Sequence, residues 1–138
     1  GQEKNRGLMH MYYRNEDIVC ICLDLSVNNI HKTIENYKYW HRQVSKNCDK
    51  KDQLIVIVGT KIDNRNENMN EETIRNAIDN ESYLYFETSA LKNIGITEMF
   101  KKCVDITIES LEKSLEKITK RDQVLELTKN KNSSQCCN

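Results

Sequence analysis

The chain has 138 residues, a length that suits one domain with its own core and is too short for two. Its 21 lysine and arginine residues equal its 21 aspartate and glutamate residues, so no overall charge favours DNA or RNA, and we expect no nucleic-acid partner. No apolar run approaches the roughly 20 residues that cross a bilayer, and no secretion signal opens the chain, so we expect a cytoplasmic protein unless a covalent group anchors it.

The six cysteines indicate neither a disulfide framework nor a zinc site. Cys20 and Cys22 lie within an apolar run, Cys48 in a polar segment and Cys103 on a predicted helix. No Cys-x₂-Cys pair occurs, and the three histidines have no matching spacing. We therefore expect these four cysteines to act as small apolar residues in a reducing compartment, and we expect no metal ligands in this chain.

The first predicted strand lies within residues 17–24. Residues 18–23 are apolar at every position instead of at alternate ones, which favours a strand covered on both faces. A helix follows, with Thr33 as its expected N-cap. Its apolar side chains recur three or four residues apart, at Ile34, Tyr37, Trp40 and Val44.

A second buried strand is predicted over residues 54–58, which are again apolar throughout. The asparagine-rich residues 64–70 predict a loop. Asn70, followed by two glutamates, is typical of a helix start. The short helix that it predicts carries Ile74, Ala77 and Ile78 on one face.

A third strand is predicted over residues 83–86, and a long amphipathic helix begins at Thr97. The apolar residues of that helix recur at helical spacing: Phe100, Val104, Ile108, Leu111, Leu115 and Ile118. Three successive strand–helix units predict an α/β fold with a parallel sheet and right-handed crossovers. Ligands of such sheets bind at the carboxyl ends of the strands.

Two short motifs follow the second and third predicted strands, at that same end of the sheet. They are Thr-Lys-Ile-Asp at residues 60–63 and Thr-Ser-Ala at residues 88–90. The stem of Lys61 can lie along a flat ring, and the carboxylate of Asp63 can accept from two neighbouring donors that guanine has and adenine lacks. Backbone N–H groups of the second motif can donate to the guanine carbonyl. The two motifs therefore predict a guanine site.

In this order and spacing, the motifs resemble the base-binding motifs of Ras-like small GTPases. Gly-Gln-Glu at residues 1–3 and Tyr-Tyr-Arg at residues 12–14 resemble the end of the D-T-A-G-Q-E motif and the segment after it in the Rab branch. Thr-Ile-Glu-Asn at residues 33–36, with Trp40, is similar to the Rab helix start S-F-E-N-x-x-x-W. The resemblance covers nearly the whole chain and begins within the second switch.

The resemblance implies a Ras-like P-loop GTPase fold with three layers and a mainly parallel sheet, here incomplete because only three strand–helix units are present. The phosphate loop G-x-x-x-x-G-K-[ST] and the switch threonine do not occur in the sequence. In Ras-like folds the missing strands cover the side of the sheet next to residues 18–23. We therefore expect the isolated chain to have an exposed apolar edge and to aggregate or recruit a partner.

The resemblance also implies a role for each matching residue. The guanine-binding residues would be Thr60, Lys61, Asp63, Ser89, Ala90 and Leu91. Gln2 would orient the water that attacks the γ-phosphate, and the backbone N–H of Gly1 would contact that phosphate. The implied cofactors are GTP or GDP and Mg²⁺, with the metal ligands in the missing N-terminal part. The implied partners are exchange factors, GTPase-activating proteins, effectors and a prenylation escort.

Three positions depart from the Rab pattern. Thr60 stands where most Rab proteins have asparagine, although threonine occurs there in the Rac-like branch. Leu91 replaces a common lysine, a neutral change because the backbone makes the useful contacts there. Asn5 replaces the aromatic residue that usually follows Gly-Gln-Glu-x, a departure that bears on switch-dependent effector recognition. The short loop after Asp63 leaves no room for the extra helix of the Rho branch.

After Ile118 the apolar periodicity fades, and the chain ends in a polar tail that contains Cys136 and Cys137. This ending is not C-a-a-X but resembles the C-C-x ending on which Rab proteins carry two geranylgeranyl groups. Two lipids are enough for stable anchoring. We expect a partial GTPase domain over residues 1–118 and a flexible prenylated tail over residues 119–138. The protein would attach reversibly to the cytosolic face of intracellular membranes.

The complete protein is therefore expected to be a GTPase that acts as a switch in vesicle and membrane trafficking. These residues alone are expected to bind GTP weakly or not at all and to be inactive. The alternative is a truncated or degenerate GTPase-like, membrane-associated interaction module without nucleotide turnover. An unrelated flavodoxin-like α/β domain would share the alternation of strands and helices, but it gives no reason for the two base motifs and the Cys-Cys ending together.

Overall fold

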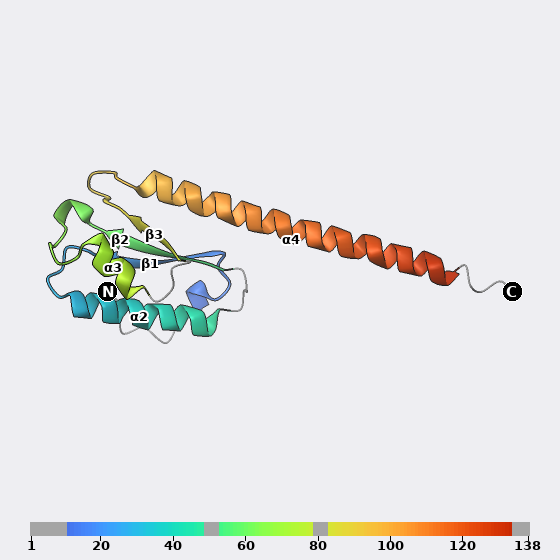
Figure 1. The fold of residues 1–138 in the computed structure, drawn as a ribbon, viewed down its shortest axis with the longest axis horizontal. Coiled ribbons are helices and arrows are strands. Elements are labelled where there is room, and N and C mark those ends of the chain that lie inside the picture. Colours follow the sequence, from blue (N-terminus) through green and yellow to red (C-terminus); the bar gives the residue numbers. More distant parts are fainter. Residues whose placement is uncertain (1–10, 49–52, 79–82, 134–138) are drawn as a thin grey trace. The chain divides into compact units, whose positions relative to one another are not determined.

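The computed structural model describes residues 11–48, 53–78 and 83–133, with side chains described up to residue 121. In chain order the elements are β1 (Ile18–Asp24), α2 (Ile30–Asn47), β2 (Leu54–Thr60), the 3₁₀ helix η2 (Ile62–Asn64), α3 (Glu71–Ala77), β3 (Leu84–Glu87) and α4 (Ile96–Ser133) (Figure 1). The strands form one sheet in the order β1-β2-β3, and both pairs are parallel. The predicted α/β fold with three strand–helix units is confirmed.

The central strand β2 has a core on each of its faces. Ile57 belongs to one buried cluster, whereas its neighbours Val56 and Val58 belong to another. This alternation follows from the pleat, which points successive side chains to opposite faces of a sheet. In β2, where residues 54–58 are all apolar, both faces are covered, as the sequence predicts.

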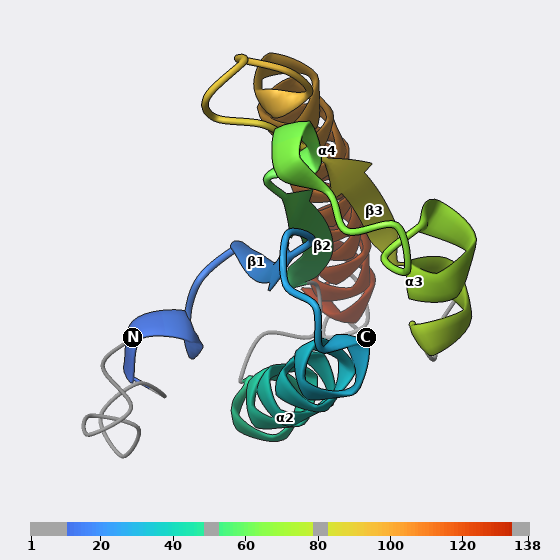
Figure 2. The same ribbon diagram turned by 90° about the vertical axis from the view of Figure 1, so that its left-hand side faces the viewer.

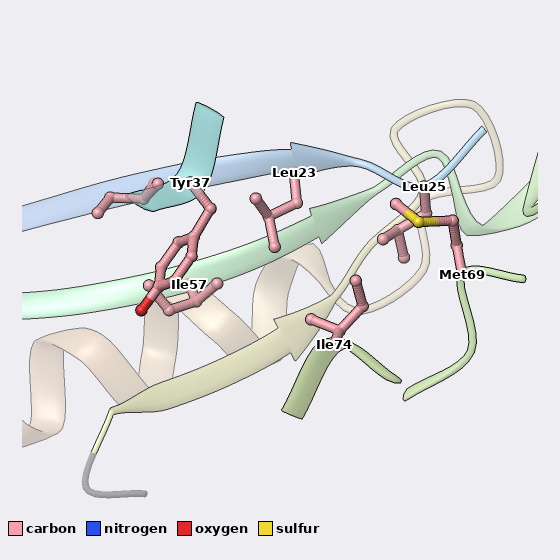
Figure 3. Close-up of a cluster of buried hydrophobic side chains, with 7 residues drawn as sticks. Leu23, Leu25, Tyr37, Ile57, Met69 and Ile74 are labelled. Carbon is pink, nitrogen blue, oxygen red and sulfur yellow. The ribbon is translucent and has the colours of Figure 1, made fainter. Parts of the chain in front are cut away.

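The larger cluster lies between the sheet and the two helices α2 and α3, which contribute to the same face (Figure 2). Its buried members are Ile21, Leu23, Leu25, Tyr37, Ile57, Met69 and Ile74. Figure 3 shows Tyr37 on a segment of α2 over the strands and Ile74 on the segment of α3 near the strand ends. Of the apolar stripe predicted for the first helix, Tyr37 and Trp40 pack in this cluster and Val44 is also buried.

The opposite face is covered only in part within the described residues. Met99 and Cys103, from the first turns of α4, pack with Val56 and Val58 of β2. On β1 the side chains of Cys20 and Cys22 are exposed, although Ile21 and Leu23 are buried. The expectation that β1 is covered on both faces is therefore wrong for the described part of the chain, because the start of α4 packs chiefly on β2.

Two helix starts can be compared with the predicted N-caps. Asn29, not Thr33, caps α2, since its side chain accepts a 3.0 Å hydrogen bond from the backbone N–H of Lys32. Thr33 lies inside the helix and is buried. Asparagine is the stronger N-cap, so the helix begins before Thr33. Asn70 caps α3 as predicted, accepting from the backbone N–H of Thr73 at 2.8 Å.

Helix α4 differs from the prediction in its buried face and in its length. Its predicted apolar stripe is 48–63% exposed, at Phe100, Val104, Ile108, Leu111, Leu115 and Ile118. The helix continues past Ile118 to Ser133, through a segment without glycine or proline. The chain divides into two compact units, residues 1–103 and 104–138. The expected domain end at residue 118 and the flexible tail after it stay predictions.

Nowhere in the described ranges does a helix combine the length and the apolarity of a membrane span.

Ile57 offers a test of the larger cluster, because its side chain is 0% exposed. We expect Ile57→Ala to lower the free energy of unfolding by about 2–5 kcal/mol and Ile57→Val by about 0.5–1.5 kcal/mol. Urea titration followed by circular dichroism would measure both values. Lys38→Ala on the exposed face of α2 is the control and should stay within about 0.5 kcal/mol of the wild type. Equal losses for the alanine and valine variants would contradict the assignment of Ile57 to a close-packed core.

Candidate functional site

The two predicted base motifs lie at one end of the sheet, where all three arrowheads point (Figure 3). Thr60 is the last residue of β2 and pairs with Asp24, the last residue of β1. Gly59 pairs with Glu87, the last residue of β3. The parallel register therefore brings the segments after β2 and β3 together, at the edge where α/β proteins bind ligands.

Backbone hydrogen bonds join these two segments directly. The backbone N–H of Thr88 donates to the carbonyl of Gly59 at 2.7 Å, and the N–H of Ile62 donates to the carbonyl of Thr88 at 3.2 Å. The side chain of Thr60 adds a link to β1, because its hydroxyl donates to the carbonyl of Leu23 at 3.0 Å. The positions of the two motifs are thus fixed by the main chain.

A side-chain contact connects the two motifs that the sequence singled out. The hydroxyl of Ser89, which is 0% exposed, donates to Oδ1 of Asp63. The same hydroxyl accepts from the backbone N–H of Lys92 at 3.0 Å. Ser89 therefore orients the Asp63 carboxylate and at the same time closes the loop that follows β3.

The loop from residue 88 to residue 95 depends on two residues with positive φ. Ser89 and Ile94 exchange two backbone hydrogen bonds of 3.0 Å across it. Asn93 has φ +52° and Gly95 has φ +72°. A Cβ atom at Gly95 would lie 2.2 Å from the carbonyl oxygen of Glu87, so this position requires glycine for space as well as for conformation.

Three hydrogen-bonding groups in and beside this loop have no partner among the described residues. Ala90 and Leu91 are exposed, the latter by 83%. Within residues 11–48, 53–78 and 83–133, their backbone N–H groups and Oδ2 of Asp63 have no hydrogen-bond partner. A flat heterocycle with two adjacent N–H donors and a carbonyl would satisfy this set of acceptors and donors.

Lys61 adopts a left-handed backbone conformation with φ +61°, directly after β2. Its Nζ atom lies 2.6 Å from Oδ2 of Asp24, and the two side chains are 60% and 35% exposed. Sequence reasoning missed Asp24 as a part of this site. The available signal was an aspartate at the carboxyl end of a strand, followed two residues later by Ser26.

A second ion pair, also missed, lies beside the motifs. Arg65, just after η2, pairs with Glu87 at the end of β3. Glu87 also accepts from the hydroxyl of Tyr85 at 2.9 Å. Burial, and then the hydrogen bond and the charge of Glu87, raise the pKa of Tyr85 well above its usual value. This pair ties the segment after Asp63 to the strand before Ser89.

Of the predicted site residues, the structure brings together Thr60, Lys61, Asp63, Ser89, Ala90 and Leu91. Gly1, Gln2, Cys136 and Cys137 lie outside the described residues. The described side chains hold no group of three or more histidine, cysteine, aspartate or glutamate residues arranged to bind a metal ion.

Known proteins match the chain along most of its length. The Ras family matches residues 1–109. The Ras-related protein RabH of Dictyostelium discoideum is 31% identical over 133 residues, which cover 96% of this chain and 61% of that protein. Rab-7B of the same organism is 32% identical, and the match covers 99% of this chain and 70% of that protein. Human Rab-9A is 31% identical, and the match covers 99% of this chain and 68% of that protein. The chain therefore spans 61–70% of the length of these relatives.

The two positive-φ residues of the loop make a matched test. We expect Gly95→Ala to destabilise the fold by at least about 1–3 kcal/mol, since the added methyl group meets backbone at an already strained φ. Asn93→Gly keeps its conformation and should change stability by less than about 1 kcal/mol. Thermal or urea unfolding would measure both. A Gly95→Ala protein as stable as Asn93→Gly would contradict the described loop geometry.

Proposed function

Because the chain belongs to the Ras family, as a Rab-type small GTPase, we propose that the complete protein binds GTP and GDP and hydrolyses GTP as a switch in membrane trafficking. The observation that carries this proposal is the pairing of Asp63 with Ser89 at the carboxyl ends of β2 and β3. These residues come from two motifs that the family uses for the base. Their contact supports a single site for the guanine ring.

In this site Asp63 would select guanine. Its carboxylate accepts from the ring N–H and the exocyclic amino group of guanine, two neighbouring donors that adenine does not offer. The free backbone N–H groups at Ala90 and Leu91 suit the guanine carbonyl, and the stem of Lys61 would lie along the ring. Thr60 and Ser89 do not need to touch the base, because they hold the two loops in position.

The phosphates would be held outside the described part of the chain. In the proposed switch the backbone N–H of Gly1 contacts the γ-phosphate and Gln2 orients the attacking water. Mg²⁺, when bound, neutralises charge on the phosphates, with its ligands in the part of the family's domain that the 138 residues do not include. Since most of the affinity comes from phosphate and metal contacts, these residues alone would bind nucleotide weakly and hydrolyse none.

Attachment to membranes would depend on Cys136 and Cys137. Two geranylgeranyl groups at these thiols would anchor the protein reversibly to the cytosolic face of an intracellular membrane. The similarity to Ras-related Rab proteins supports this role. Exchange factors, GTPase-activating proteins, effectors and a prenylation escort are the partners that such a cycle requires.

Asp63→Asn tests guanine selection. In the complete protein we expect it to weaken GDP binding at least about 100-fold, since two charge-assisted contacts of about 1.5–3 kcal/mol each are lost. Binding of xanthosine diphosphate should improve, because xanthine offers an acceptor where guanine has its amino group. Calorimetry in the presence of Mg²⁺ measures both affinities. Glu67→Gln, the same change of charge at an exposed residue in the loop after η2, is the control.

Unchanged GDP affinity in Asp63→Asn would refute the guanine assignment. Absence of Mg²⁺-dependent GDP binding by the wild-type complete protein would remove the switch and favour an interaction module that retains the motifs without nucleotide turnover.

Gln2→Leu tests the catalytic assignment. We expect single-turnover GTP hydrolysis by the complete protein to slow at least about tenfold, while GTP affinity stays within about twofold, because the glutamine positions water and contributes little to binding. Equal hydrolysis rates in the variant and the wild type would exclude this role for Gln2.

A further inference from the structure

The ammonium group of Lys61 is held at a defined place beside the candidate base site. Asp24 ends β1 and is paired in register with Thr60, the residue before Lys61. The left-handed conformation of Lys61 is compatible with a side chain that reaches back to β1, where Nζ lies 2.6 Å from Oδ2 of Asp24. The lysine stem therefore spans the carboxyl ends of two neighbouring strands.

Asp24 is itself oriented by Ser26. Both the backbone N–H and the hydroxyl of Ser26 donate to Oδ1 of Asp24, at 3.0 and 2.6 Å. Because Oδ1 is occupied in this way, Oδ2 is the oxygen that accepts from Lys61. Partial burial raises the pKa of Asp24, but the hydrogen bonds from Lys61 and Ser26 outweigh it and hold the pKa below its usual value. The carboxylate is thus charged at neutral pH.

This ion pair is too exposed to contribute much to folding. The lysine side chain is 60% exposed and the aspartate side chain 35%, and pairs of this kind stabilise proteins only slightly. Its effect on a ligand is of another kind. A long lysine side chain that is already ordered loses less conformational freedom when a ring packs against its stem.

We propose that Asp24 is a positioning residue of the base site, which acts on the ligand through Lys61. It holds the lysine stem across the ends of β1 and β2, ready to lie along the guanine ring, and Ser26 holds Asp24 in turn. This inference rests on the proposed guanine-binding function, and it assigns to that site two residues that lie outside the base motifs.

A double-mutant cycle tests the proposal. The complete protein is loaded with a fluorescent GDP analogue, and the dissociation rate of the analogue is measured for Asp24→Asn, Lys61→Met and the double variant. We expect Asp24→Asn alone to speed dissociation roughly two- to fivefold, the range for one exposed ion pair. In the Lys61→Met background the same substitution should change the rate by less than about 1.5-fold, because Asp24 acts only through the lysine.

Two further measurements sharpen the cycle. Ser26→Ala keeps the charge of Asp24 but removes one of its hydrogen bonds. Its dissociation rate should therefore lie between those of the wild type and Asp24→Asn. The difference in dissociation rate between the wild type and Asp24→Asn should become smaller at about 1 M salt, because salt screens an exposed ion pair.

Glu71→Gln is the matched control. It breaks another exposed ion pair, in which Arg75 Nε lies 2.7 Å from Glu71 Oε1 and the side chains are 55% and 54% exposed. This pair lies within α3 and includes no residue of the two base motifs and no contact of Lys61, so the dissociation rate should not change.

The outcomes separate this inference from the function on which it rests. A wild-type protein that binds no GDP refutes the proposed function and this inference with it. Weakened binding in Lys61→Met with an unchanged rate in Asp24→Asn refutes only the positioning role. Asp24→Asn could instead change the dissociation rate by the same factor with Lys61 and with Met at position 61, and lower the stability towards urea equally in both. Asp24 would then serve only the fold.

Discussion

Parallel pairing of β2 with both of its neighbours is the constraint on which the rest of the structure depends. It aligns Asp24 with Thr60 and Gly59 with Glu87, so three strands end at one edge. The hydrogen bond from the backbone N–H of Thr88 to Gly59 extends the pairing beyond the last residue of β3. The side chains of the site can meet only because this register holds. A slip by one residue would turn every side chain of the slipped strand to the other face and separate the two motifs.

The site combines main-chain rigidity with few side-chain requirements. In the proposed base site, the groups that would contact the ligand are two backbone N–H groups, one carboxylate and one lysine stem. Ser89, Thr60 and the backbone hydrogen bonds keep the two loops that carry them in place. In this proposal the side chain of Leu91, which is exposed, can differ from the lysine common in the family, because only its backbone N–H would contact the base. Gly95 has no such freedom, because a Cβ atom there would collide with the backbone of Glu87.

Features encoded by neighbouring residues could be predicted from the sequence, whereas contacts between distant segments could not. The apolar runs identified β1 and β2, and the Asn70 cap was evident from the two glutamates that follow it. The two base motifs were recognised as pieces, but their contact through Asp63 and Ser89 had to be seen in the structure. The contacts of Asp24 with Lys61 and of Arg65 with Glu87 join distant segments, so no spacing rule reveals them. The exposed side of β1 was mispredicted for a related reason, since apolar residues alone do not say what covers them.

Neighbouring strands of this sheet are also consecutive in the chain, with Ile18 paired to Leu54 and Val56 paired to Leu84. The sheet can therefore grow in the order of synthesis, each strand pairing with its predecessor after the helical segment between them. Of the segments that form the proposed base site, the loop of residues 88–95 is synthesised last. Asp63 can accept from Ser89 only after the loop that ends at Gly95 has formed. In the proposed function, a nascent chain would therefore bind nucleotide only after β1, β2 and β3 have paired.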